Sequence, residues 1–230
     1  MALPPQVVAP QPVVVDDVHK TYPGEPRITA LAGVSLALAR GEMVALMGPS
    51  GCGKSTLLGL IGAQDRPSAG TIVIDGVPTT ALDEGAMAKL RRERVGMVFQ
   101  SFNLLDSLSV IDNVALPLIL QGREMSEFGA AASAILEAVG MASRARARPS
   151  ELSGGQQQRV AIARALVHEP AVLLADEATG NLDSATADAV LDLLRKFAQR
   201  GQSIVIATHS SEVAERCDRI IRMRDGAIVG

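Results

Sequence analysis

The sequence of 230 residues is poor in aromatic side chains, with one Tyr, four Phe and no Trp. Its core must therefore be aliphatic, and an aromatic platform for stacking RNA bases is not expected. A net charge of only −3 argues against a protein that neutralises nucleic-acid phosphates. The two cysteines, Cys52 and Cys217, form neither a disulfide framework nor a metal-binding spacing. No apolar run approaches the ~18 residues of a membrane-spanning helix. We therefore expect a globular protein of the cytosolic side, with no nucleic acid as partner.

Apolar patterns along the chain predict an α/β fold. Strand-like runs alternate with helical patterns, which is typical of a mainly parallel sheet covered on both faces. The expected strands lie at 13–18, 35–39, Met43–Met47, 71–74, Val95–Phe99, 171–175, 203–207, 219–223 and 227–229. The helices expected between them lie at 54–62, 185–198 and 212–216.

The middle of the chain has a different character. Helical patterns at 109–120, 127–139 and 156–167 follow one another without a strand pattern, so a helical subdomain is expected at about 101–168. Residues 1–12 are rich in Pro, Val and Gln and lack the basic start of a signal peptide. We expect them to form a flexible tail before one domain that covers 13–230.

A glycine-rich loop follows the expected strand Met43–Met47. Residues 48–55 match G-x-x-x-x-G-K-[ST], and they stand between a strand and a helix, as this motif requires. Small residues let backbone N–H groups converge on phosphate oxygens, and the helix N-terminus adds partial positive charge. Lys54 is expected to reach the β- and γ-phosphates, and the Ser55 hydroxyl to bind Mg²⁺. Cys52 contributes only its backbone. The expected nucleotide contacts of this loop are Gly48, Ser50, Gly51, Cys52, Gly53, Lys54, Ser55 and Thr56.

Two adjacent acids, Asp176 and Glu177, end the apolar run that includes 172–175. Adjacent carboxylates are costly to bury without a cation, which favours a role beside a metal ion. Asp176 would bind Mg²⁺ directly or through water, and Glu177 would act on the attacking water as general base. The pattern alone leaves a second interpretation open, a solvated strand end with a helix-capping acid.

The identity of the base is indicated only weakly. No [NT]-K-x-D guanine-reading pattern occurs in the chain. Tyr22, the sole Tyr, is expected on a loop after the first strand. Its ring could stack on a base, an interaction worth ~1–3 kcal/mol in single-strand binding. A surface tyrosine without a ligand is the alternative.

A second anion site is expected at Ser153, Gly154, Gly155 and Gln156, before the helical pattern at 156–167. Ser153 is placed to cap the helix, and the two glycines leave its N-terminus open. One chain thus offers two anion-binding helix starts but only one acidic strand end. The simplest use of both is a head-to-tail pair of chains that share each nucleotide.

The segment Leu-Ser-Gly-Gly-Gln at 152–156, between that phosphate loop and that acidic strand end, resembles the nucleotide-binding subunit of ABC transporters. The resemblance extends from residue 13 to 229. It implies a P-loop NTPase fold with an N-terminal antiparallel β portion, and ATP and Mg²⁺ as cofactors. It also implies roles for four residues: Tyr22 stacks on adenine, Gln100 contacts Mg²⁺ and water and reports on the membrane partner, Asp183 lies in the D-loop, and His209 contacts the γ-phosphate. The implied catalytic residues are Glu177, His209, Gln100 and Lys54, and the implied metal ligands are Ser55, Gln100 and Asp176.

The resemblance implies an ATPase subunit that dimerises around two ATP molecules and drives an integral membrane permease from the cytoplasmic face of the inner membrane. Residues 99–120 and 174–183 are similar to the lipoprotein-release (LolD) and macrolide-export (MacB) group. Ala178 departs from the pattern, since relatives often have Pro there. The alternative function is an ABC-type ATPase that acts as a regulator or scaffold, as in cell division. A third class, soluble ABC proteins of DNA repair or translation, would require a long coiled coil or a second ATPase module.

Overall fold

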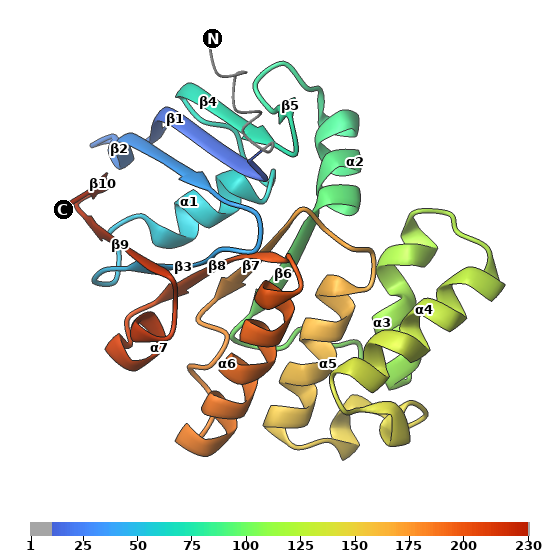
Figure 1. Cartoon of the computed structure of the whole chain (residues 1–230). Helices are drawn as coiled ribbons and strands as arrows, with labels where there is room; N and C mark the ends of the chain where they lie inside the picture. Colours follow the sequence, from blue (N-terminus) through green and yellow to red (C-terminus); the bar gives the residue numbers. More distant parts are fainter. Residues whose placement is uncertain (1–10, 230) are drawn as a thin grey trace, which may run out of the picture.

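The computed structural model describes residues 11–229 and is built around a six-stranded sheet in the order β10-β9-β3-β8-β7-β6 (Figure 1). Its strands are β3 (Met43–Met47), β6 (Val95–Phe99), β7 (Val172–Asp176), β8 (Ser203–Thr208), β9 (Arg219–Arg224) and β10 (Ala227–Ile228). All neighbours pair in parallel except β10, which pairs antiparallel with β9. The mainly parallel sheet expected from the sequence is confirmed.

A second sheet is antiparallel, with the order β2-β1-β4-β5. It consists of β1 (Val13–Tyr22), β2 (Ile28–Leu38), β4 (Ala69–Ile74) and β5 (Val77–Pro78). Helix α1 (Lys54–Ile61) lies between the two sheets (Figure 1). The prediction that Tyr22 lies on a loop is wrong: Tyr22 is the last residue of β1 and pairs with Ile28, because the ladder continues until Pro23.

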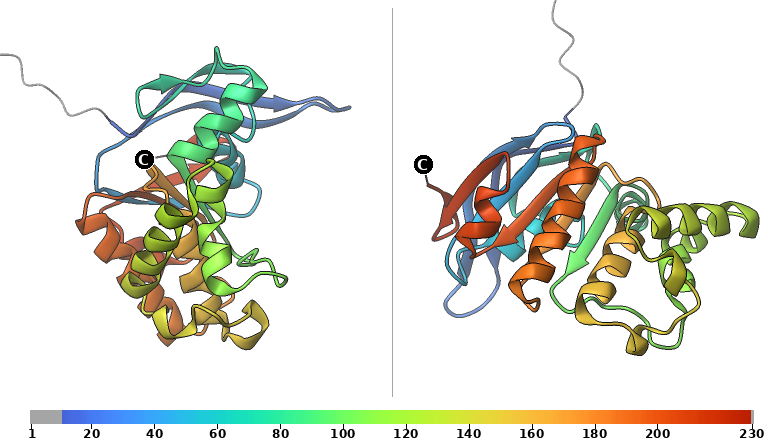
Figure 2. Two further views of the ribbon diagram at one scale, coloured as in Figure 1. Left: turned by 90° about the vertical axis from the view of Figure 1, so that its right-hand side faces the viewer. Right: turned by 60° about the horizontal axis from the view of Figure 1, so that its bottom comes forward.

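The remaining helices are α2 (Glu84–Arg94), α3 (Val110–Leu120), α4 (Met125–Ala138), α5 (Gly154–Leu166), α6 (Ser184–Gln199) and α7 (Ser211–Glu215), with short 3₁₀ turns at Ala142–Arg144 and Pro149–Glu151. Helices α3, α4 and α5 pack on one another, and the views in Figure 2 show them and the antiparallel strands at opposite ends of the molecule. No strand interrupts residues 109–168. Helix α5 also packs on β6 and α6, which connects this helical part to the sheet.

The core has two halves, one on each face of the parallel sheet. Leu173 and Ile204 face α3–α6, whereas Leu174 and Val205 face α1 and the antiparallel sheet. Successive side chains of a strand point to opposite faces, so the inner strands β3, β7 and β8, which are covered on both sides, bury nearly all their residues. This explains the unbroken apolar runs from which the strands could be predicted.

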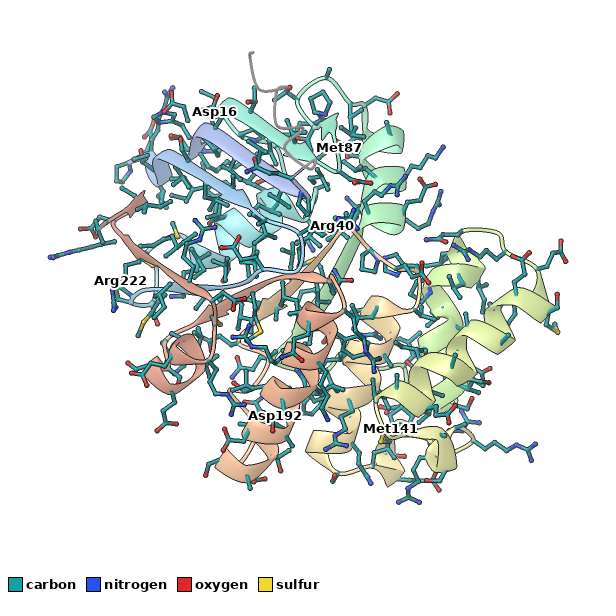
Figure 3. The ribbon with its side chains drawn as sticks, viewed as in Figure 1. Asp16, Arg40, Met87, Met141, Asp192 and Arg222 are labelled. Atoms are coloured by element: carbon teal, nitrogen blue, oxygen red, sulfur yellow. The ribbon has the colours of Figure 1, made fainter. Side chains whose placement is uncertain are left out.

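Helix α2 was not expected, because the sequence at 89–94 shows only a charged stretch. Asp83 caps the helix by accepting a hydrogen bond from the Ala86 N–H at 2.7 Å. Met87 and Leu90 are its buried residues, and Met87 lies beside the antiparallel strands (Figure 3). Two buried apolar residues in a helix of eleven are too few to give a strong helical pattern in the sequence.

The predicted tail, residues 1–12, lies mostly outside the described residues. Of its members, Pro12 is buried, and its carbonyl accepts a hydrogen bond from the Asp75 N–H at 2.8 Å. None of the helices between residues 11 and 229 combines the length and the apolar character of a membrane-spanning segment.

Candidate functional site

The candidate site lies along one edge of the parallel sheet. Strands β3, β8, β7 and β6 are consecutive parallel neighbours, so their C-terminal ends meet at the same edge. The glycine-rich loop follows β3, His209 follows β8, Asp176 ends β7 and Gln100 follows β6. Ligands of open α/β sheets bind outside the carboxyl ends of the strands. The topology thus gathers residues that are far apart in the chain.

The loop after β3 leaves the start of α1 open. Gly53 stands at the N-cap with φ 104, and no side chain caps the helix. A Cβ on Gly48 would lie 2.3 Å from the Met223 carbonyl oxygen, so this position has no room for a side chain. Backbone N–H groups at an uncapped helix start are donors for an anion.

Lys54 is curled into this loop. Its Nζ donates hydrogen bonds to the carbonyl oxygens of Gly48 at 2.6 Å and Pro49 at 2.9 Å, and the residue is only 7% exposed. The same Nζ lies 3.9 Å from Cys52 Sγ, and its hydrogen-bond partners among the described residues include no carboxylate, so this buried ammonium lacks a counter-charge. The loop therefore presents a cation and open N–H groups at one place, which is the chemistry that binds phosphate.

Glu177 lies opposite His209. The Glu177 Oε1 is 3.0 Å from His209 Nδ1, so the imidazole donates through Nδ1 and the carboxylate accepts. Glu177 has φ 49, a left-handed conformation that costs a non-glycine residue about 1–2 kcal/mol. Its N–H donates to the Ala207 carbonyl of β8 at 3.0 Å, which helps hold this conformation. Such strain persists where the surrounding structure fixes it, often at functional sites.

A cavity of about 330 Å³ opens beside this pair. It is lined by Ser55, Phe99, Gln100, Ser101, Asn103, Asp176 and Glu177. Hydroxyl, amide and carboxylate oxygens from Ser55, Gln100 and Asp176 are the hard ligands that Mg²⁺ prefers. The Gln100 Nε2 donates to Asn181 Oδ1 at 3.0 Å, which leaves the amide oxygen of Gln100 as the candidate ligand. The residues therefore fit a Mg²⁺ ion, which Ser55, Gln100 and Asp176 would hold. Across the described part of the chain, no group of three or more His, Cys, Asp and Glu could hold a metal by itself.

Tyr22 is fixed by two neighbours that sequence reasoning missed. Its Oη donates to Asp65 at 3.1 Å, and the Lys20 Nζ lies 4.8 Å from the ring centroid. Lys20 and Asp65 form an ion pair at 2.7 Å. Partial burial raises the pKa of Asp65, but the hydrogen bond and charge of Lys20, with smaller contributions from Arg66 and Tyr22, lower it overall. Tyr22 remains 37% exposed.

Tyr22 also lies near the phosphate loop. It pairs with Ile28 of β2. Two residues further along β2, the Ala30 carbonyl would lie 2.6 Å from a Cβ on Gly53. The exposed tyrosine and the open helix start therefore belong to one surface region.

The second predicted anion site is a capped helix start. Ser153 Oγ accepts from the Gln156 N–H at 3.4 Å, and Gln156 Oε1 accepts from the Ser153 N–H at 3.0 Å. Ser153 and Gly154 are exposed. Figure 1 shows the start of α5 at the foot of the helical part, away from the loop between β3 and α1. The structure thus brings the residues of the sheet edge together. Residues 153–156 lie at the start of α5 instead, where Gly154 packs near Phe102 and Leu182.

Asp183 caps the neighbouring helix α6 and contacts the same region. It accepts from the Thr186 N–H at 3.0 Å and from the Thr186 hydroxyl at 2.7 Å. These hydrogen bonds, the hydroxyl first, hold the pKa of Asp183 below its ordinary value. A Cβ on Gly155 would lie 2.3 Å from Thr186 Cγ2, so the starts of α5 and α6 pack closely.

Comparisons with known proteins agree with this geometry. A family model described as "ABC transporter" matches residues 31–180. The lipoprotein-releasing system ATP-binding protein LolD of Anaeromyxobacter dehalogenans is 47% identical over 225 residues, covering 96% of this chain and 94% of the relative. The macrolide export ATP-binding/permease protein MacB 1 of Aeromonas hydrophila is 48% identical over 206 residues, covering 90% of this chain but only 32% of the relative.

Solved structures give the same result. The ABC transporter cassette MJ0796, solved as a dimer, superposes with a TM-score of 0.85 at 43% identity, covering 95% of this chain and 97% of the other. A second structure of MJ0796 is described as a dimeric post-hydrolysis state bound to ADP and Pi. The resemblance seen in the sequence is confirmed, and none of these relatives is named as a regulator or scaffold. The chain belongs to the ABC transporter family, as one of its ATP-binding, ATP-hydrolysing subunits.

Proposed function

We propose that two copies of this chain close around two ATP molecules and drive an integral membrane permease from the cytoplasmic face of the membrane. The proposed transporter is of the lipoprotein-release or macrolide-export type. Two relatives support this assignment: one is named for lipoprotein release, and the other for macrolide export as an ATP-binding and permease protein in one chain. This chain spans about a third of that second relative, which leaves the permease to a separate partner or segment.

One observation supports the proposal most strongly. Lys54, His209 and Glu177 follow the three adjacent parallel strands β3, β8 and β7, and Glu177 and His209 are in hydrogen-bond contact at 3.0 Å. A phosphate held at the loop would lie on the same edge as a carboxylate able to accept a proton from water. This is the arrangement that phosphoryl transfer to water requires.

The reaction would begin with an exchange of partners at Lys54. Its Nζ would leave the carbonyls of Gly48 and Pro49 for β- and γ-phosphate oxygens, while N–H groups at the start of α1 bind the same phosphates. Gly48, Ser50, Gly51, Cys52, Gly53 and Thr56 complete the proposed loop contacts. Mg²⁺, held by Ser55, Gln100 and Asp176, would neutralise charge that develops on the phosphate oxygens.

Glu177 would then act as general base. Its carboxylate accepts a proton from the attacking water, while His209 orients the carboxylate and contacts the γ-phosphate. Tyr22 would stack on adenine with the ring face that Lys20 leaves open. Each role follows from a position at the edge or on the adjoining β1–β2 surface.

The second copy would complete each site. Ser153 and Gly154 are exposed, and Gly155 and Gln156 follow them at the start of α5, which Figure 1 shows away from the loop between β3 and α1. Placed head to tail, the same turn would meet the γ-phosphate of the partner, and Asp183 would lie at the same interface. A monomer is therefore expected to hydrolyse ATP poorly.

The surface proposed for the permease is a groove between α2, α3 and β6. A cavity of about 490 Å³ has the apolar side chains of Met97, Leu116, Pro117 and Leu120 in its lining. The same lining contains arginines, and Leu120 is 63% exposed. A cytoplasmic segment of a permease with apolar and acidic side chains would fit here. Met97 lies on β6, three residues before Gln100, which connects the groove to the proposed metal site.

Glu177→Gln tests the central assignment. The variant should bind ATP and form a trapped dimer on size exclusion, while steady-state hydrolysis falls by about 10²–10⁴-fold, the usual contribution of a general base. Glu169→Gln, at the opposite end of the strands, is the matched control and should hydrolyse normally. Near-normal hydrolysis by Glu177→Gln would refute the role of the base.

A further inference from the structure

Gln158 on α5 has a buried side-chain amide that is only half used. This polar residue has no exposed surface, and its helix neighbours Val160, Ala161 and Ile162 are all apolar core residues. Its Nε2 donates to the Ala178 carbonyl at 2.5 Å. Within the described residues, its Oε1 has no hydrogen-bond partner. A buried polar group without a partner is costly, so this position requires a reason other than core packing.

The acceptor of this hydrogen bond follows Glu177 directly. Glu177 adopts φ 49, and the backbone on either side of it is held by the Ala207 carbonyl and by the Gly180 N–H, which donates to the Glu177 carbonyl at 2.9 Å. Ala178 is itself only 4% exposed. Gln158 thus supplies a side-chain anchor to this strained turn from another helix.

We propose that Gln158 is a positioning residue for Glu177. Its amide fixes the carbonyl of Ala178 and with it the left-handed turn that directs the Glu177 carboxylate toward the hydrolytic site. The inference rests on the proposed function, in which Glu177 is the general base. Gln158 itself touches no nucleotide.

The anchor also connects two half-sites. Gln158 lies five residues after Ser153, on the helix whose start is proposed to meet the nucleotide of the partner. The turn that it anchors serves the nucleotide of its own chain. A shift of α5 when the dimer closes would therefore move Ala178 and the adjoining Glu177. The hydrogen bond gives closure at one nucleotide a direct path to the base at the other.

Gln158→Met tests this role, because Met preserves length and approximate volume but removes the donor. We expect kcat to fall about tenfold or more, since small misplacements of a catalytic group are costly. The ATP dissociation constant should stay within about twofold, because the loop and Tyr22 are untouched. Gln202→Met is the matched control: Gln202 also donates to backbone carbonyls, Pro170 and Ser203 at 3.1 Å each, but at the opposite edge of the sheet.

A double variant separates positioning from a general loss of stability. In a Glu177→Gln background, Gln158→Met should cause no further loss of single-turnover hydrolysis, since the group that it positions is gone. Gln158→Asn retains an amide but is one methylene shorter, and it replaces Gln158→Met in the same comparisons if that variant does not fold.

An unchanged kcat in the Gln158 variants, or an equal loss in the Glu177→Gln background, would overturn the inference. Failure of the proposed function would appear elsewhere, as normal turnover by Glu177→Gln alone. The two failures are therefore distinguishable.

Discussion

The two glycines at the start of α5 should respond differently to the same substitution. A Cβ on Gly155 would lie 2.3 Å from Thr186 Cγ2, whereas a Cβ on Gly154 would meet nothing closer than Phe102 at 3.6 Å. Thr186 cannot rotate away without loss, because its hydroxyl donates to Asp183 at 2.7 Å. Gly155→Ala must therefore displace a fixed side chain, and Gly154→Ala need not.

The magnitude follows from a comparison of the two variants. Both gain the advantage of Ala over Gly in a helix, at most about 1 kcal/mol. Only Gly155→Ala suffers overpacking, which typically costs about 1–3 kcal/mol. The free energy of unfolding of Gly155→Ala should therefore lie about 1–3 kcal/mol below that of Gly154→Ala. For a chain of this size, that corresponds to a Tm about 2–12 °C lower.

Urea and thermal unfolding of the two variants measure this difference. Thr186→Ser removes Cγ2 but keeps the hydroxyl, so it should restore most of the stability lost by Gly155→Ala. Equal stability of the two glycine variants would refute the packing argument. The same conclusion would follow if Thr186→Ser gave no rescue.

Three further expectations concern other parts of the molecule. Asp218 accepts hydrogen bonds from the Met43 N–H at 2.8 Å and from Arg195 at 2.6 Å. Partial burial raises the pKa of Asp218, but these two partners lower it overall. Asp218→Asn should therefore cost about 1 kcal/mol of stability at neutral pH. Urea titrations should show the full difference in free energy of unfolding between wild type and variant above about pH 4. The difference should vanish as the pH falls through the lowered pKa of Asp218 in the folded state, and a difference that persists in acid would contradict this. Tyr22→Ala should weaken ATP binding by about 5–100-fold through lost stacking, measured by calorimetry, and an unchanged affinity would exclude the stack. Burial raises the pKa of the Cys217 thiol to about 11, so a thiol reagent at pH 8 should modify it slowly until urea unfolds the chain, and fast modification of the folded chain would contradict its burial.

The sequence predicts most of the fold because both faces of the parallel sheet are covered. Runs such as Met43–Met47 and Val95–Phe99 are apolar throughout and end at glycines or polar residues, so their bounds could be read directly. Helix α2 escaped prediction because only Met87 and Leu90 of its residues are buried. The prediction of a loop at Tyr22 was wrong because the sequence near Pro23 shows no alternation of apolar and polar residues that would indicate the pairing of β1 with β2.

The site divides in the same way. The phosphate loop and the acidic strand end are contiguous in sequence, so Lys54 and Glu177 could be identified there. Contacts between distant segments could not: Asp65 meets Tyr22 across 43 positions, and Gln158 meets Ala178 across 20. Such pairs depend on how the elements pack. In the sequence, only the third glutamine of the run 156–158 hints at the contact between Gln158 and Ala178.

In the proposed closed dimer, two copies of the chain hold each ATP. The most direct measurement is a structure of Glu177→Gln with Mg-ATP, in which the distance from the γ-phosphate at Lys54 to Ser153 is determined in each protomer. We predict that Ser153 of the partner subunit lies about 3 Å from a γ-phosphate oxygen, while Ser153 of the same chain lies far from it. A closed dimer in which this turn faces solvent, or in which one chain supplies both contacts, would contradict the shared site.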